Sequence, residues 1–447
     1  MALLPARSGM LAGARRRVAL AFVPIAALWF VVFWAALGVR PAGETKQAEP
    51  ASAVLQQIVA SGQTAPVGGS FDRFEIAGQA IPAPTNLSGD VAFFANIARG
   101  KAEEGLFIAR EERIDKIAAV GDVTPGGEHI ADFTDHPVLA LDKAGTVAFA
   151  AALTGGKATS GVFVAAHGKI EPIVLSGAAA PDIAGGTLVS VERPVLDDSG
   201  NVAVLVSVRR GRDVSDAILL RRGAEWHKLV CVGDPAPGGG TFSGFGAPAI
   251  NNRGAVAFPA VVDQGPILGG IYLFEEGEAR LALAAGSPAP DGGIFGKFSE
   301  QVAINDAGAI VFSAVLRQGG PPGAVFVLEG DAVRPIAAIG EPAPGGGTFS
   351  AFTSWPVLSP LGTVGFVASI DGGPSPSGVF LHGADGLNRL AAVGETLANG
   401  GRLVSFPLFP AIAIGPDDAV TFAATSERDG ARRDAIFYYG EPRQARR

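Results

Sequence analysis

The chain has 447 residues, of which 48% are hydrophobic and 17% charged, and its formal net charge is −8. A chain of this length can bury a large core, and its low charge content excludes extended disorder. Gly and Pro together number 94, but no three-residue period accompanies them, so a collagen-like fibre is excluded as well.

The N-terminal residues predict a membrane anchor or an export signal. Residues 1–17 form a basic segment with four arginines, and residues 18–39 form an uncharged apolar run. As a helix this run would span about 33 Å, which suits a transmembrane anchor better than the ~7–15 apolar residues of a signal peptide. The arginines favour a cytoplasmic N-terminus, which places the rest of the chain outside the cytoplasmic membrane. Cleavage at the small residues Ala36–Gly38, which would release the chain, is the alternative.

Residues 40–53 are polar and rich in Ala, Glu and Pro, which predicts a linker. The first 53 residues hold six Lys/Arg and two Asp/Glu, a charge of +4, so the remainder carries about −12 of the total −8. Nucleic-acid binding requires Lys and Arg to neutralise phosphates, so this acidic remainder argues against a nucleic-acid partner.

A unit of 53 to 59 residues then recurs seven times between residues 54 and 441. Each copy has a glycine after a short apolar run, a Pro/Gly-rich stretch such as "DPAPGGGTF" (residues 234–242) and a turn such as "NNRGAVAF" (residues 251–258). The marking glycines are Gly62, Gly121, Gly177, Gly233, Gly286, Gly340 and Gly394.

Each unit contains four short β-prone runs separated by turn signals, which is typical of one blade of a β-propeller. We therefore predict an all-β, seven-bladed propeller preceded by one hydrophobic helix; a solenoid is the competing interpretation. The first run, Leu55–Gly62, matches the fourth strand of a unit, and the last, Asp434–Glu441, matches the third. The two ends are therefore predicted to share a blade and close the ring, leaving residues 442–447 as a tail.

The turns predict a specific backbone conformation. Asn or Asp starts five of the turns and Ser359 the sixth, and Gly accepts positive φ three residues later. The seventh copy departs from this pattern, with Gly415 and Asp418 at the two positions. The six glycines expected at positive φ are Gly89, Gly145, Gly200, Gly254, Gly308 and Gly362.

Two resemblances rest on these repeats. The strand–turn–strand core, for example "PVLSPLGTVGF" (residues 356–366), resembles the repeats of TolB-type propellers. The Asn-x-x-Gly-x-x-Ala-Phe motif, best matched at Asn86–Phe93 and Asn251–Phe258, resembles that of bacterial exported tandem-repeat proteins known as choice-of-anchor proteins. The resemblance covers Leu55 to about Glu441; it implies a surface or periplasmic location and no reaction.

Other recurring features are predicted to be structural. A hydrophobic pair three residues apart, such as Phe242 and Phe245, follows the glycines in every copy, which favours blade packing over an aromatic ligand platform. Cys231 occupies a slot that holds Ala or Leu in five other copies, which favours a buried hydrophobe over a nucleophile. The variable stretches between the second and third runs, such as Arg209–Asp216, are predicted to be loops.

Little in the sequence points to catalysis or to a cofactor. The five histidines show no metal-ligand spacing, the acidic turns resemble no complete calcium loop, and the Pro/Gly-rich stretches precede strands instead of the helix that a phosphate loop needs. No Gly-x-Ser-x-Gly elbow is present. We therefore expect no metal and no cofactor.

A binding site is predicted where the copies differ, because a slot whose chemistry varies between blades is not dictated by the fold. The segment before each inner strand is such a slot, and in a propeller it would surround the mouth of the central channel. Surface drift at loop positions is the alternative interpretation of this variation. The candidate ligand-binding residues are Asp135, His136, Glu192, Arg193, Glu300, Gln301 and Trp355.

The function expected from the sequence is a non-catalytic binding or scaffold module at the cell envelope. Its partner would be a protein or a glycan, with residues 18–39 in the membrane and the domain a monomer. The alternative is a propeller enzyme, a glycan hydrolase or lyase, that uses acidic residues at the channel mouth.

Overall fold

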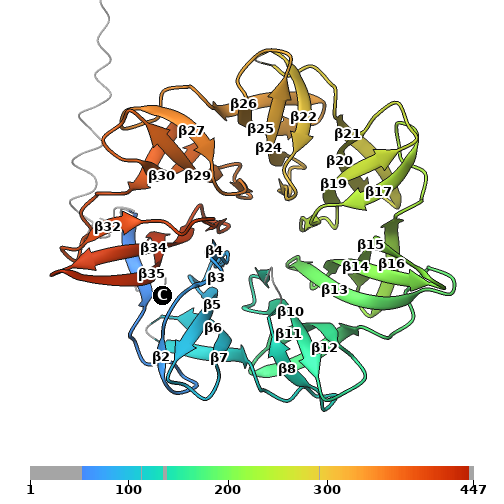
Figure 1. The fold of residues 1–447 in the computed structure, drawn as a ribbon, viewed down its shortest axis with the longest axis horizontal. Coiled ribbons are helices and arrows are strands. Elements are labelled where there is room, and N and C mark those ends of the chain that lie inside the picture. The colour runs from blue at the N-terminus through green and yellow to red at the C-terminus, as the bar shows by residue number, and fades with distance from the viewer. Residues whose placement is uncertain (1–52, 112, 134–137, 291, 442–447) are drawn as a thin grey trace, which may run out of the picture. The chain divides into compact units, whose positions relative to one another are not determined.

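The structure, a computed structural model, describes residues 53–111, 113–133, 138–290 and 292–441. The chain divides into two compact units, Met1–Pro50 and Ala51–Arg447, and the described residues belong to the second. This second unit is a ring of seven antiparallel sheets around a central axis (Figure 1). The predicted seven-bladed all-β propeller is therefore confirmed. The predicted N-terminal helix at residues 18–39 lies outside the described residues, and no helix among the described residues is long and apolar enough to cross a membrane.

The long strands of the blades contain the apolar runs that the sequence repeats. In blades 1 to 6 three such strands follow one another across the sheet. They are β5 (Val91–Ala98), β6 (Glu104–Arg110) and β7 (Arg113–Ala119) in blade 1; β10 (Val147–Thr154), β11 (Ser160–Ala166) and β12 (Lys169–Leu175) in blade 2; β14 (Val202–Arg210), β15 (Asp213–Arg222) and β16 (Glu225–Cys231) in blade 3; β19 (Val256–Asp263), β20 (Gly269–Glu275) and β21 (Glu278–Ala284) in blade 4; β24 (Ile310–Arg317), β25 (Gly323–Glu329) and β26 (Ala332–Ala338) in blade 5; and β29 (Val364–Asp371), β30 (Ser377–Gly383) and β31 (Gly386–Ala392) in blade 6.

The first strand of most blades is interrupted, which the sequence did not predict. In blades 2, 4, 5, 6 and 7 it forms two short pieces that pair with the two ends of the same neighbour. In blade 3 it is one strand, β13 (Thr187–Leu196), whose pairing is irregular between Glu192 and Val195. The pieces are β8 (His129–Asp132) and β9 (Leu139–Leu141); β17 (Thr241–Phe245) and β18 (Ala249–Ile250); β22 (Ile294–Phe298) and β23 (Ala303–Ile304); β27 (Thr348–Phe352) and β28 (Val357–Leu358); and β32 (Arg402–Ser405) and β33 (Ile412–Ile414).

The seventh blade joins the two ends of the domain. Strand β1 (Val54–Ala60) pairs antiparallel with β35 (Ala431–Gly440), which follows β34 (Val420–Arg428). The pairing runs from Val54 opposite Gly440 to Ala60 opposite Ala435. The predicted closure of the ring by its N- and C-terminal strands is confirmed, and it removes the sheet edge that β35 would otherwise expose.

Blade 1 contains an extra hairpin at the centre of the ring. Its first strand is reduced to β2 (Ser70–Phe71), and β3 (Glu75–Ile76) and β4 (Gln79–Ala80) then form a separate two-stranded sheet (Figure 1). The hairpin turns at Gly78, whose φ is 85°, a conformation that favours glycine. Its end pairs with blade 7: the N–H of Ala80 donates to the carbonyl of Phe409 over 2.9 Å. The ring is therefore closed a second time, near its axis.

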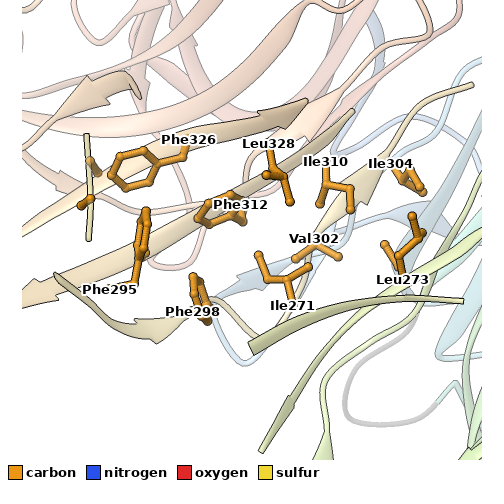
Figure 2. Close-up of a cluster of buried hydrophobic side chains, with 14 of the residues drawn as sticks. Ile271, Leu273, Phe295, Phe298, Val302, Ile304, Ile310, Phe312, Phe326 and Leu328 are labelled. Carbon is orange, nitrogen blue, oxygen red and sulfur yellow. The ribbon is translucent and has the colours of Figure 1, made fainter. Parts of the chain in front are cut away.

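The hydrophobic cores lie between neighbouring blades. Figure 2 shows one of them, in which Ile271 and Leu273 of blade 4 meet Phe295, Phe298 and other residues of blade 5. The rings of Phe295 and Phe298 lie 5.6 Å apart, and Phe295 meets the edge of Phe326 at 5.1 Å. The hydrophobic pairs that recur three residues apart therefore pack blades, as predicted, and Cys231 is buried in another of these cores.

The Asn-x-x-Gly turns have the predicted backbone. All six glycines have positive φ, between 75° and 92°, and Asp418 takes the glycine position of the seventh turn with φ 62°. In blade 4 the side chain of Asn251 accepts hydrogen bonds from the N–H groups of Arg253 and Ala255, over 3.1 and 3.0 Å. The seventh turn therefore keeps the common geometry with a non-glycine residue, at a cost in backbone strain.

The same turns link neighbouring blades into a continuous belt of hydrogen bonds. The Nδ2 group of Asn251 donates to the carbonyl of Asn305 in the next blade over 2.9 Å. All seven interfaces are bridged in this region, by Asn86 to Asp142, Lys143 to Asp198, Asp198 to Asn252, Asn251 to Asn305, Asn305 to Ser359, Thr363 to Asp418 and Thr421 to Ala83.

One predicted loop is mostly strand. Residues Arg209–Asp216 were expected to be irregular, but Arg210 pairs with Asp213 and the turn is confined to the two residues between them. The polar side chains of this stretch misled the prediction, because the end of the hairpin extends beyond the core and both of its sides are solvated.

Candidate ligand-binding site

A cavity of about 920 Å³ follows the axis of the ring. Most of the lining comes from the first strands of blades 2 to 7 and from the hairpin region of blade 1, so the wall consists of segments that are far apart in the sequence. Toward the turns the wall is aliphatic. One residue directly before each turn of blades 2 to 7 lines it, and we call this set the aliphatic collar: Leu141, Leu196, Ile250, Ile304, Leu358 and Ile414.

The polar residues of the cavity lie on the segments that precede the collar along the chain. Four of the predicted residues line the same cavity: Arg193, Glu300, Gln301 and Trp355. Glu192 does not; its side chain is exposed on β13 and it is not part of the lining. Asp135 and His136 lie outside the described residues. The structure thus brings four of the seven predicted residues, from blades 3, 5 and 6, to one cavity.

The predicted slot does not precede the inner strand; it interrupts it. Regular pairing is broken between β17 and β18 at Gly246–Pro248, and equivalent segments of blades 5 and 6 break it too. Pro248 and Pro356, the last residues of two of these segments, have no N–H to give to the sheet. Glu300, Gln301 and Trp355 lie in such interruptions, whereas Arg193 lies in the irregular part of β13.

Arg193 has an unusual backbone. Its φ is 49°, in the left-handed region that favours glycine, and Pro194 follows it. A non-glycine residue there costs about 1 kcal/mol or more, which the surrounding structure must offset. Such strain is often found at functional positions, so the conformation is a second reason, besides the variable slot, to assign a role to this side chain.

Glu300 and Gln301 are held by the neighbouring blade and by their own. The N–H of Ala247 in blade 4 donates to the carbonyl of Glu300 over 2.9 Å. A Cβ at Gly246 would collide with that carbonyl oxygen, so this approach requires glycine. In blade 5 the Ser299 hydroxyl donates to the carbonyl of Gln301 over 2.7 Å. The segment is therefore fixed before any ligand binds.

Trp355 is half-buried in the wall of blade 6, and the residues before it attach the segment to β29. The N–H of Thr353 donates to the carbonyl of Val367 over 2.9 Å, and the N–H of Val367 donates to the Ser354 hydroxyl over 2.8 Å. These bonds fix the chain directly before Trp355, whose indole offers an aromatic surface to a ligand.

Sequence reasoning missed two residues of the lining. Phe409, from blade 7, is 56% exposed although it is aromatic, and Lys297, from β22, lies 3.9 Å from the carboxylate of Glu300. Phe409 belongs to the same variable slot, so its aromatic side chain was the signal that could have identified it. Lys297 lies within the strand before the slot, and no signal in the sequence distinguished it.

Electrostatics elsewhere in the domain do not point to a second site. The pKa of Glu75 is raised by burial and by the nearby Asp434 carboxylate, and the pKa of Glu104 is raised by burial and then by Asp132. Neither residue lines the cavity. The described residues contain no cluster of three His, Cys, Asp or Glu side chains that could hold a metal ion.

The ring of seven blades, closed by both chain ends around a ligand-sized cavity, defines a β-propeller with an axial pocket. Residues 30–324 and 262–440 match a family of unknown function (DUF7453), and the chain belongs to that family. No curated protein matches the sequence.

Several solved structures share the propeller fold at low identity. The chain is similar to a puromycin-hydrolysing peptidase from Mycobacterium tuberculosis (11% identity, TM-score 0.47), covering 83% of this chain and 56% of that one. It is similar to TolB from Acinetobacter baumannii (13% identity, TM-score 0.36), covering 87% and 97%. It is also similar to a six-bladed fungal lectin from Aleuria aurantia (11% identity, TM-score 0.35), covering 78% and 96%. These similarities concern the fold and assign no ligand.

Proposed function

We propose that the chain is a non-catalytic binding module of the cell envelope, whose ligand enters the axial cavity. The observation that carries this proposal is the convergence of Arg193, Glu300, Gln301 and Trp355 on one cavity of about 920 Å³. These positions differ between blades, so the fold does not require them, yet hydrogen bonds hold their segments in place. Volume and lining both match small-molecule sites, which enclose about 300–1,000 Å³ and place a few polar groups on an apolar wall.

A propeller enzyme that acts on glycans remains the second candidate from the sequence. Canonical glycoside hydrolysis uses two carboxyl groups on either side of the scissile bond. Among the described residues Glu300 is the single carboxylate in the lining, and its nearest charged partner is Lys297. The geometry therefore supports binding better than hydrolysis.

The location at the envelope rests on the sequence. We propose that residues 18–39 anchor the chain in the cytoplasmic membrane with the propeller outside, or that they are removed during export. A reporter enzyme that folds only in the oxidising environment outside the cytoplasmic membrane should be active when it is fused after residue 53. Activity restricted to the cytoplasm would contradict this placement.

The binding role is tested by capture from an envelope extract with the full-length chain. One variant combines Arg193→Met, Glu300→Gln and Trp355→Ala at the cavity. The control variant combines Arg253→Ala and Leu361→Ser, two exposed residues of the turns at the other end of the blades. We expect a component that the wild type retains to be lost by the cavity variant and kept by the control. Loss by the control alone would place the site on the opposite face.

A further inference from the structure

The residues that line the axial cavity change from polar to aliphatic along its length. In blade 5 the chain passes from Glu300 and Gln301 through Val302 and Ile304 to the turn at Asn305. Blade 3 repeats this order, from Arg193 through Val195 and Leu196 to its own turn. Each inner segment runs along the axis toward the turns, so polar groups lie at one end of the cavity and the aliphatic collar at the other.

Among the residues that the structure describes, Arg193 is the cation of this polar end that is left for a ligand. Lys297 lies 3.9 Å from Glu300, whereas Arg193 forms no ion pair with any residue in the described part of the chain. A guanidinium presents a planar fork of donors that matches the two oxygens of a carboxylate. Arg193 lines the cavity from a backbone with φ 49°.

The aliphatic collar restricts the rest of the ligand. Ile304 and Leu358 are buried in the cores between blades, so a ligand would meet the four half-buried members, Leu141, Leu196, Ile250 and Ile414. None of these side chains carries a hydrogen-bonding group, so sugar hydroxyls placed against them would lose their hydrogen bonds to water without replacement. An apolar chain, in contrast, gains about 0.8 kcal/mol for each methylene buried, which corresponds to about fourfold in affinity. Trp355 and Phe409 extend this apolar wall toward the polar end.

We infer that the cavity binds a small amphipathic monocarboxylate, with its carboxylate on Arg193 and its apolar chain along Trp355 into the aliphatic collar. This inference rests on the proposed binding function and names the ligand class. A single negative charge fits better than a dianion, because in the described lining Arg193 is the one cation without an ion pair, and the residues after 53 carry a net charge of about −12. The polar end of the cavity thus recognises the carboxylate, and the aliphatic end recognises the apolar chain of the same molecule.

Trp355 supplies a direct readout. The chain has four tryptophans, and changing Trp29, Trp34 and Trp226 to Phe leaves Trp355 as the single fluorophore, inside the cavity. The full-length single-tryptophan chain, held in lipid nanodiscs, is titrated with octanoate, and empty nanodiscs provide the correction for partition into lipid. Octanol and octyltrimethylammonium are the matched neutral and cationic probes.

We expect octanoate to shift the Trp355 emission saturably and at lower concentration than either matched probe. Extending hexanoate to octanoate should lower Kd about 15-fold, at about fourfold per methylene. Arg193→Met should weaken octanoate roughly 10- to 150-fold, the range for a lost hydrogen bond to a charged group, and leave octanol unchanged. Arg193→Lys should restore part of the loss, and Arg210→Met, an exposed arginine outside the lining, should change nothing.

A variant of the aliphatic collar keeps the test independent of Arg193. Ile414→Ser should reduce the gain from hexanoate to octanoate while leaving the preference for octanoate over octanol. Equal binding of the three probes, or octanoate binding that survives Arg193→Met unchanged, would overturn the inference. If no amphiphile binds but the cavity variant still loses a captured envelope component, the ligand class is wrong and the binding function stands. If the capture is also insensitive to the cavity, both are wrong.

Discussion

Asn251 allows the contribution of a turn and that of a blade interface to be measured separately. Its side chain is buried; its Oδ1 accepts from the N–H groups of Arg253 and Ala255, and its Nδ2 donates to the carbonyl of Asn305. Asn251→Ala removes all three hydrogen bonds. Asn251→Asp keeps the two acceptor bonds of the turn, as Asp142 does in blade 2, and removes only the bond between blades.

The expected magnitudes follow from this count. Each bond contributes about 1 kcal/mol net, so Asn251→Ala should cost about 3 kcal/mol of the free energy of unfolding. The carbonyl of Asn305 also accepts from Gly308 and is not left without a partner, so Asn251→Asp should cost only about 1 kcal/mol. The reverse change, Asp142→Asn, adds a donor beside blade 3 and should stabilise the protein by up to about 1 kcal/mol.

Urea unfolding of the full-length chain, followed by tryptophan fluorescence, measures these differences as shifts of the midpoint at constant slope. The expected order of midpoints is Asp142→Asn, wild type, Asn251→Asp and Asn251→Ala, from highest to lowest. Equal midpoints for Asn251→Ala and Asn251→Asp would refute the contribution of the turn bonds. A midpoint of Asn251→Asp equal to that of the wild type would refute the contribution of the belt between blades.

Three further predictions concern single groups and the closure of the ring. Tyr272→Phe should stabilise the protein by up to about 1 kcal/mol, because the buried Tyr272 hydroxyl has no hydrogen-bond partner in the described part of the chain; a lower urea midpoint would contradict this. Glu104→Gln should raise the midpoint at pH 7 but not at pH 4. Burial, and then Asp132, raise the pKa of Glu104 above 4.5, so the folded state binds more protons than the unfolded state and stability falls as pH rises through the folded pKa; equal effects at both pH values would exclude this cause. Deletion of Val54–Ala60 should expose the edge of β35 and cause self-association in light scattering, and a monodisperse protein of unchanged stability would show that β1 is dispensable.

The fold could be predicted because the repeat shows each signal seven times. A single turn of this kind is weak evidence, but six of them with glycines 54 to 56 residues apart fix the position of the strands around them, and their glycines have the expected φ. The shared seventh blade was predictable from the order of the runs within the repeat, because the first apolar run of the domain matched a fourth strand and the last run matched a third strand. Long, regular strands such as β19 and β24 were therefore predictable from local pattern alone.

The interrupted first strands were not predictable, because the groups that interrupt them are far apart in the sequence. The N–H of Ala247 leaves the sheet to donate to Glu300, and that of Ala80 to Phe409. No local pattern contains both partners. For the same reason the sequence grouped Glu192 with Arg193, although only Arg193 lines the cavity, and it placed no weight on Lys297.

The sharing of blade 7 between both ends of the chain has a consequence for synthesis. Val54–Ala60 are among the first residues of the domain to leave the ribosome, and their partners in β35 follow about 375 residues later. At about 5–20 residues per second, translation takes roughly 20 to 75 s to supply those partners. During that time β1 is an unpaired strand with an apolar end, and six blades can fold in order beside it. The nascent chain therefore remains open at one seam until translation is almost complete, and this seam is where a chaperone would be needed longest.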